Sequence, residues 1–214
     1  MLIEQVPQCI RRFFQPVIWR GNAKEKKIFL TFDDGPTPEI TPWILDLLDM
    51  YNVKATFFCI GNNVEKYPDL FLEMQQRGHQ VGNHAYTHKR GMFTDTKIFF
   101  EDIARAQKLI NSDLFRPPHG HITPRQIKKL KHTFKIVLWD VITRDYDATL
   151  PPEIILQNVK KYSRNGSIIV FHDSLKAEKN LRYALPKSLA FWKEKGYECS
   201  LIHPTITTSS DKNR

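Results

Sequence analysis

The sequence predicts an α/β fold in which about seven parallel strands are covered by helices. Short β-rich runs alternate with helical patterns along the whole chain, and no shift in composition divides its 214 residues. Strict alternation of strands and helices is typical of a parallel sheet. Such a sheet can close into an incomplete (β/α) barrel or stay open and doubly wound. The glycine-rich dinucleotide fingerprint is missing after the first strand, which disfavours the open sheet.

Each element is predicted from its apolar pattern and from the residues that begin or end it. Pro42 lies near the start of the first helix, and Gly78 ends the second. Thr94 or Asp95 can cap the third helix, and Pro124 lies in the first turn of the fourth. The predicted strands are residues 26–32, 55–60, 79–84, 114–117, 135–141, 167–172 and 197–202. The predicted helices are residues 40–51, 63–78, 94–110, 123–132, 152–164 and 183–195.

The net charge of +9 suggests an acidic partner, such as an anionic polymer or a membrane surface. The lysines are nevertheless spread over several amphipathic segments and form no stripe interleaved with aromatic residues. No nucleic-acid-binding module is recognisable, so solubility explains the basic composition better. We expect no nucleic acid among the partners of this protein.

Cysteine usage and the amino-terminal segment predict a cytoplasmic protein. Cys9, Cys59 and Cys199 lie far apart without CxxC spacing, and free thiols suit a reducing compartment. Residues 1–20 lack the uninterrupted apolar core of a signal peptide, and no run approaches the ~18 apolar residues of a membrane span. Residues 10–20 mix arginines with large apolar side chains. Packing of this segment on the domain is the preferred interpretation, and a weak contact with the inner membrane face is the alternative.

Chemically active residues recur where the predicted strands end. The carboxyl ends of the strands of a parallel α/β barrel meet at one rim, where such barrels assemble their sites. Surface polar residues would not favour one rim repeatedly, so a single convergent site is the better hypothesis. In chain order the residues at this rim are Asp33, Asp34, His84, His88, Arg116, His119, Asp145 and His172.

Two motifs, TFDDGP and NHAYTH, together predict a metal site. His84 and His88 share a face if the backbone turns helically between them, so both imidazoles could reach one ion. An aspartate from TFDDGP would complete the two-nitrogen, one-oxygen set of a catalytic zinc or a non-haem iron site. Neighbouring side chains diverge, so we assign Asp34 to the metal and Asp33 to the water beside it. Taken separately, the histidine pair could be structural and Asp-Gly-Pro a simple turn.

Hydrolysis also needs an acid, an orienting group and a donor for the oxyanion. His172 has a suitable rim position for the acid, although a capping hydrogen bond is the simpler explanation when it is taken alone. Arg116 stands in a loop stiffened by two prolines, and near Asp33 it would hold that carboxylate ionised and oriented. The backbone N–H of His119 is free to meet a developing oxyanion, whereas the prolines before it have no N–H.

These motifs, in this order, resemble the polysaccharide deacetylase family, also called the NodB-homology domain. TFDDGP, NHAYTH, RPPHG, a tryptophan-containing strand with a later aspartate, and VFH match the family's five motifs over residues 28–172. The resemblance implies a distorted, incomplete (β/α) barrel over residues 25–203. Residues 1–24 would be an extension packing on it, and residues 204–214 a flexible tail. It also implies metal-dependent hydrolysis of an acetyl group, most simply an N-acetyl group, on a carbohydrate partner.

The resemblance assigns a role to each rim residue. It implies a general base, a general acid, and the two residues that orient them, namely Asp33, His172, Arg116 and Asp145. It implies that Zn2+, or another divalent ion such as Co2+ or Ni2+, is held by Asp34, His84 and His88. The substrate-binding positions are His119 and the two residues that would line the acetyl-methyl pocket, Tyr146 and Val170.

Three positions depart from the family's pattern. His119 stands where an aromatic residue is usual, Ile142 replaces the first of two acids in the fourth motif, and Tyr146 replaces a tryptophan. None of these changes removes a metal ligand, the base or the acid, so we expect activity. A carbohydrate-binding protein with a vestigial site is the alternative. A non-haem iron oxygenase would share the metal triad, but Asp33 and His172 have no obvious work in oxygen activation. The glycan, the metal used in the cell and the oligomeric state stay open.

Overall fold

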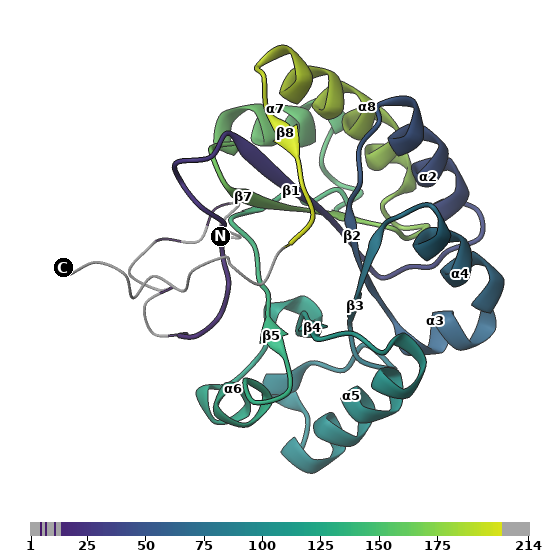
Figure 1. Cartoon of the computed structure of the whole chain (residues 1–214), viewed down its shortest axis with the longest axis vertical. Helices are drawn as coiled ribbons and strands as arrows, with labels where there is room; N and C mark the ends of the chain where they lie inside the picture. Colours follow the sequence, from purple (N-terminus) through teal and green to yellow (C-terminus); the bar gives the residue numbers. More distant parts are fainter. Residues whose placement is uncertain (1–4, 6, 8–10, 12–13, 203–214) are drawn as a thin grey trace.

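The computed structural model describes residues 5, 7, 11 and 14–202, which form a curled sheet with helices around its outside (Figure 1). The strands are β1 (Lys27–Asp33), β2 (Thr56–Cys59), β3 (Gln80–Asn83), β4 (Leu114–Phe115), β5 (Lys135–Ile136), β6 (Val141–Ile142), β7 (Ser167–His172) and β8 (Glu198–Cys199). The helices are α2 (Thr41–Met50), α3 (Gly61–Lys66), α4 (Pro68–Gln76), α5 (Thr96–Ile110), α6 (Pro124–Leu130), α7 (Pro152–Tyr162) and α8 (Glu178–Glu194). Two short 3-10 turns are η1 (Gly91–Phe93) and η2 (Pro118–Gly120).

The pairing of the strands confirms the distorted barrel. All pairs of named strands in the described part of the chain are parallel, in the order β5-β4-β3-β2-β1-β7-β6, with β8 beside the start of β1. The two ends of this path, β5 and β6, belong to one segment, residues 135–142. That segment pairs first with β4 and then with β7, so the sheet curls round on itself. With β5 and β6 counted as one, the eight-stranded sheet has the expected seven strand segments.

Alternation along β1 separates the outer core from the barrel interior. Ile28, Leu30 and Phe32 join the core that packs against the surrounding helices. Phe29 joins a different cluster with interior residues of β2, β4 and β7. Because side chains alternate along a strand, Asp33 faces the interior like Phe29. The same short strand therefore anchors the helices with one set of side chains and supplies the rim with the other.

The prediction of one continuous helix over residues 63–78 is wrong. The structure has two helices there, α3 and α4, with non-helical backbone at Tyr67. Pro68 causes the break, because its ring disfavours helical backbone in the preceding residue and it has no N–H to donate. Proline in the first turn of α4 is, by contrast, well tolerated.

The single strand expected over residues 135–141 is also wrong. Its beginning pairs with β4 and its end with β7, and Val137 between them bridges to Ile18 instead. The division follows from the curvature of the sheet, because one straight strand could not reach both edges. The last helix starts earlier than expected, at Glu178. Asn180 in its first turn donates to the backbone carbonyls of Asp145 and Asp147, which lie in the loop between β6 and α7.

The described part of the amino-terminal segment lies against the barrel. Val17 and Ile18 are buried, and Phe14 and Trp19 pack on the cluster between α5 and α6. These apolar side chains of the segment 10–20 are therefore used within the fold. The tail over 204–214 lies outside the described residues, and the division at residues 25 and 203 stays a prediction. Among the described helices, none combines the length and apolar character needed to cross a membrane.

Asp140 ties this segment to the end of the barrel opposite the rim. It is fully buried and accepts hydrogen bonds from Arg11, Arg164 and Ser167 at the start of β7. Burial alone would raise the pKa of Asp140, but the hydrogen bonds from Arg164, Ser167 and Arg11 outweigh it and lower that pKa. The charged carboxylate of Asp140 therefore connects the amino-terminal segment, the segment before β6 and the start of β7.

We predict that Asp140→Asn lowers the free energy of unfolding by about 2–3 kcal/mol, because the amide removes the buried charge to which Arg11 and Arg164 donate. Denaturant unfolding at pH 7 measures this loss. Since the folded-state pKa is depressed, the contribution exists above the ordinary Asp pKa and disappears as the pH falls through the folded value. The two proteins should therefore converge in acid. Asp46→Asn, which removes an exposed partner of Arg77, is the control and should cost much less.

Candidate active site

The rim residues expected from the sequence converge at the carboxyl ends of the strands. Asp33 and His172 are direct register partners on the neighbouring strands β1 and β7. His84 follows β3 immediately, and its N–H bonds to the last residue of β2. Arg116 follows β4, and its N–H bonds to the last residue of β3. The parallel register therefore places all four side chains at one level of the barrel.

A buried ion pair holds Asp33. The Arg116 side chain is fully buried and donates from Nη1 to Asp33 Oδ1 at 2.6 Å and to Thr31 Oγ1 at 2.8 Å. Its guanidinium also lies 4.0 Å from the centre of the Phe58 ring. Burial lowers the pKa of Arg116, which the Asp33 carboxylate partly offsets, and a guanidinium stays charged at physiological pH. The other oxygen of Asp33, Oδ2, is left facing His84, 3.9 Å from its Nε2.

Asp34, His84 and His88 form a cluster whose three ligand atoms lie within 4.8 Å of one another. Asp34 Oδ1 lies 3.8 Å from His84 Nε2 and 3.3 Å from His88 Nε2. This oxygen is buried, and within the described residues it accepts no hydrogen bond. A buried carboxylate oxygen without a donor, facing two imidazole nitrogens, fits a divalent cation between them.

The tautomer of His84 suits a ligand. Its Nδ1 lies 2.7 Å from the carbonyl oxygen of Arg116, which can only accept, so Nδ1 carries the proton and Nε2 the lone pair. Burial, and then the neighbouring His88, lower the pKa of His84 well below its ordinary value. His84 is therefore neutral, as a metal ligand must be. Two nitrogens and one oxygen suit zinc and similar divalent ions, with positions left for water and substrate.

The backbone does not turn helically between His84 and His88, although both side chains reach the same cluster. The loop is irregular, with positive φ at Ala85 and His88. It is fixed by the buried Asp102 of α5, which accepts from the Tyr86 and Thr87 N–H groups and from the Thr87 hydroxyl. Sequence reasoning missed this support. An acid within the apolar stripe of an amphipathic helix was the available signal.

His172 is held by a carboxylate. Asp145 is fully buried, and its two oxygens accept from His172 Nδ1 at 2.7 Å and from the His172 N–H at 2.8 Å. Burial alone would lower the pKa of His172, but Asp145, with smaller contributions from Asp34 and Asp33, raises it to about 9. The imidazole is therefore protonated at neutral pH. Tyr146 packs edge-on against His172 with ring centres 4.7 Å apart.

The remaining substrate-binding candidates lie beside these groups. Val170 is buried two residues before His172 on β7, so alternation puts both side chains on one face. His119 has positive φ, and its N–H donates to no acceptor in the described part of the chain. Its ring lies 4.4 Å from that of His88. Burial, followed by His88 and Arg90, lowers the pKa of His119 to about 4, so this side chain is neutral.

Two further residues support the TFDDGP turn and were not found from the sequence. Asn63 donates from Nδ2 to the Asp34 carbonyl, and Asp34 itself has φ of 85°. Asp173 lies against Gly35 so closely that a Cβ there would collide with its carboxyl group. Burial raises the pKa of Asp173 to about 8, against a hydrogen bond from Thr41, with a smaller rise from Asp34. The glycine of TFDDGP is therefore required by packing as well as by turn chemistry.

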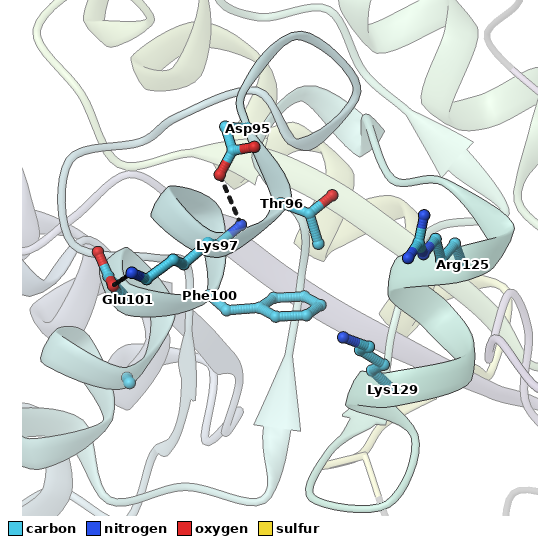
Figure 2. A pocket seen from close by; sticks show the side chains of 8 residues that line it. Asp95, Thr96, Lys97, Phe100, Glu101, Arg125 and Lys129 are labelled. Carbon is cyan, nitrogen blue, oxygen red and sulfur yellow. Dashed lines mark hydrogen bonds and ion pairs between the residues drawn. The ribbon is translucent and has the colours of Figure 1, made fainter.

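Two grooves lie on the outer surface between α5 and α6. One, of about 610 Å³, is lined by Asp95, Thr96, Lys97, Phe100, Glu101, Ala104, Arg125 and Lys129 (Figure 2). The other, of about 460 Å³, continues along the same helices and shares Phe100 and Ala104. Neither groove is lined by any of the expected catalytic or metal-binding residues. The buried acidic, basic and imidazole side chains lie together at the rim, and the rim is therefore the candidate active site.

Comparison with curated proteins finds deacetylases. The chain is 36% identical over 161 residues to a peptidoglycan-N-acetylglucosamine deacetylase of Bacillus cereus, covering 72% of this chain and 58% of that protein. A second Bacillus cereus protein of the same name is 34% identical over 198 residues, covering 88% of this chain and 93% of that protein. The chain thus spans less than two thirds of the first relative but nearly all of the second.

Solved structures agree with this comparison. The Bc1960 peptidoglycan N-acetylglucosamine deacetylase superposes with a TM-score of 0.85 at 30% identity, covering 97% of this chain and 100% of that one. BA3943 of Bacillus anthracis, a CE4 family pseudoenzyme, superposes with a TM-score of 0.79 at 26% identity, covering 89% and 69%. The family model described as polysaccharide deacetylase matches residues 20–134. The resemblance seen in the motifs is confirmed, and the chain belongs to the polysaccharide deacetylase family.

Proposed function

We propose that this protein is a metal-dependent hydrolase that removes the N-acetyl group from a sugar of a glycan. The observation that carries the proposal is that two side chains beside the Asp34–His84–His88 cluster are each held by a buried, oppositely charged partner. Asp33 is held by the buried Arg116, and His172, its register partner, is held by the buried Asp145. The names of the relatives make peptidoglycan the first substrate to test.

The residues of the rim divide the work of hydrolysis between a base and an acid. When bound by Asp34, His84 and His88, a divalent ion supplies a Lewis acid for the acyl oxygen and lowers the pKa of water. Asp33 accepts the proton of the attacking water on Oδ2, the oxygen that Arg116 leaves unoccupied. His172 gives its proton to the amine as the carbon–nitrogen bond breaks.

Backbone and apolar groups complete this scheme. Asp145 holds the His172 Nδ1–H, so the proton that His172 transfers is the one on Nε2. The N–H of His119, without an acceptor in the described part of the chain, donates to the developing oxyanion. Tyr146 and Val170, beside His172, border the acetyl methyl group.

A glycan-binding protein without turnover is the second candidate. Two observations favour it: the CE4 relative BA3943 is a pseudoenzyme, and Ile142 stands where the fourth motif usually has an acid. Against it, the candidate base, acid and metal cluster are all present and oriented by buried partners. An iron oxygenase has no comparable support, because the similar proteins are peptidoglycan deacetylases and a pseudoenzyme of the CE4 family.

The direct test is acetate release from N-acetylated and O-acetylated sugars, including peptidoglycan fragments, with added zinc and with a chelator. We expect zinc-dependent release from N-acetylated substrates, loss of release on chelation, and recovery when zinc, cobalt or nickel is returned. Stoichiometric glycan binding by metal-loaded protein without any acetate release would support the second candidate instead.

We predict that Asp33→Asn lowers kcat by about 10²–10⁴-fold, the usual contribution of a general base. Metal content should stay unchanged, because Asp33 is not one of the three clustered ligands. Elemental analysis and acetate release measure the two effects. Asp34→Asn is the matched control, and it should lose metal. Activity of Asp33→Asn within about tenfold of the wild type would disprove the assignment of the base.

We predict that Asp145→Asn moves the alkaline limb of the pH profile of kcat to lower pH by about 1–3 units. The acid must be protonated, so activity is expected below the raised pKa of His172 and is lost above it. Removing the Asp145 charge lowers that pKa, while the amide oxygen still accepts from Nδ1–H and keeps the ring in place. An unchanged alkaline limb would show that His172 is not the titrating acid.

A further inference from the structure

Exposed apolar side chains gather where α5 begins. Met92 and Phe93 in η1 are 54% and 75% exposed, and Ile98 in the first turn of α5 is 49% exposed. These are three of the nine large apolar side chains that are exposed in the described part of the chain, and they lie within the seven residues 92–98. Single exposed apolar side chains are normal, whereas a contiguous group of them marks a contact surface.

The turn that carries these side chains is held by its neighbours. A Cβ on Gly91 would lie 2.9 Å from the Phe99 ring and 2.6 Å from the His121 carbonyl oxygen, so η1 packs against both α5 and the loop before α6. The buried Gln126 of α6 donates to the Gly91 carbonyl at 2.8 Å. The apolar side chains are therefore presented on a supported backbone, with α6 directly beside them.

The neighbouring helix α6 supplies cations. Arg125, Lys128 and Lys129 are exposed, and their spacing of three and four residues puts them on one face of that helix. None of the three forms an ion pair with a carboxylate among the residues that the structure describes. Arg125 and Lys129 lie across the groove of Figure 2 from the start of α5, which carries Ile98. The positive charge of α6 is therefore adjacent to the apolar turn and is not neutralised there.

Arg90, which directly precedes η1, adds a fourth exposed cation. Burial, and then the charge of Arg90, lowers the pKa of His121, whose ring lies 5.4 Å from that of Phe93. The two acids that line the groove of Figure 2 are already engaged. Asp95 caps α5, and Glu101 lies 4.0 Å from the ammonium group of a lysine in the same helix. The surface around the apolar turn is therefore positively charged.

We propose that this surface binds peripherally to a membrane that contains anionic lipids. Acyl chains accept apolar side chains without a shaped pocket, and anionic headgroups attract the cations around them. The net charge of +9 adds attraction at longer range. The apolar side chains described in the segment 10–20 pack within the fold, whereas those of this surface are open to water. We call this surface the basic apolar patch, which consists of Arg90, Met92, Phe93, Ile98, Arg125, Lys128 and Lys129.

The basic apolar patch borders the candidate active site. The ring of His121, beside Phe93, lies 5.8 Å from that of His119, which in turn lies 4.4 Å from that of His88. A protein bound through the patch therefore holds the rim of its barrel beside the lipid surface. The inference does not depend on the proposed activity, because binding to a membrane needs no turnover.

The test measures co-sedimentation of the full chain with vesicles of phosphatidylcholine alone and of equimolar phosphatidylcholine and phosphatidylglycerol. We expect the protein to bind the mixed vesicles and to bind phosphatidylcholine much more weakly. The triple variant of α6 should weaken binding to the mixed vesicles by about 10²-fold, at roughly fivefold for each cation. That variant is Arg125→Gln, Lys128→Gln and Lys129→Gln. Its matched control removes three exposed charges from α8, at the opposite end of the molecule in Figure 1, by Lys179→Gln, Lys187→Gln and Lys193→Gln. The control should weaken binding much less.

The apolar contribution is tested with a separate pair of variants. Met92→Ser combined with Phe93→Ser should weaken binding to the mixed vesicles by about tenfold or more, because these side chains no longer gain from leaving water. Met50→Ser combined with Leu72→Ser changes two exposed apolar side chains on α2 and α4 and is the matched control. This control should bind the vesicles as the wild type does.

The outcomes separate a lipid surface from other partners. Weaker binding of both patch variants, with both controls close to the wild type, supports the proposal whether or not the protein releases acetate. No binding to the mixed vesicles overturns it, and so does binding that neither patch variant weakens more than its control. If only the charge variant loses binding, and the wild type binds soluble polyglutamate as tightly as the mixed vesicles, the patch serves an acidic polymer and the lipid proposal is overturned.

Discussion

The buried ion pair between Arg116 and Asp33 is the interaction on which the geometry of the site depends. Its guanidinium joins β1, through Asp33 and Thr31, to the segment after β5, through the Leu138 carbonyl. The carbonyl of the same arginine sets the tautomer of His84. A fully buried charge that loses its partner is strongly destabilising, so the strands around this pair have little freedom to separate. The orientation of the candidate base and the closure of the barrel are thus linked through one side chain.

Backbone strain is concentrated at this rim and is offset by neighbouring side chains. Positive φ occurs in residues of four rim loops: Asp34, Ala85, His88, His119 and Arg144. Such conformations cost about 1–3 kcal/mol each and persist only where the surrounding structure over-determines them. Asn63 bonds the Asp34 carbonyl, Asn83 bonds the Ala85 N–H, and Asp102 holds the next two N–H groups. These candidate site residues therefore stand on irregular loops, while the residues that support them stand mainly on helices and strands.

His84 and His172 show how the hydrogen-bond partner of a buried imidazole sets its protonation state. Burial opposes the charged form of both, yet their pKa values move in opposite directions. The Nδ1 of His84 meets a neutral carbonyl and a second histidine lies nearby, so the ring stays neutral and can offer a lone pair. The Nδ1 of His172 meets a buried carboxylate, so the ring holds a proton. The candidate metal ligand and the candidate acid are thus the same residue type in two different surroundings.

The sequence by itself determined the parallel sheet, the order of the motifs and the rim on which they fall, because alternation and strand ends are local patterns. It also indicated the pairing of Asp33 with Arg116, which the structure places at 2.6 Å. Only the tertiary structure decided how residues 135–142 divide between two edges and how the loop from His84 to His88 is shaped. Both depend on contacts between segments far apart in the chain, such as those that Asp102 makes with the loop. Local sequence patterns do not predict such contacts, because the residues come into contact only once the sheet has curled.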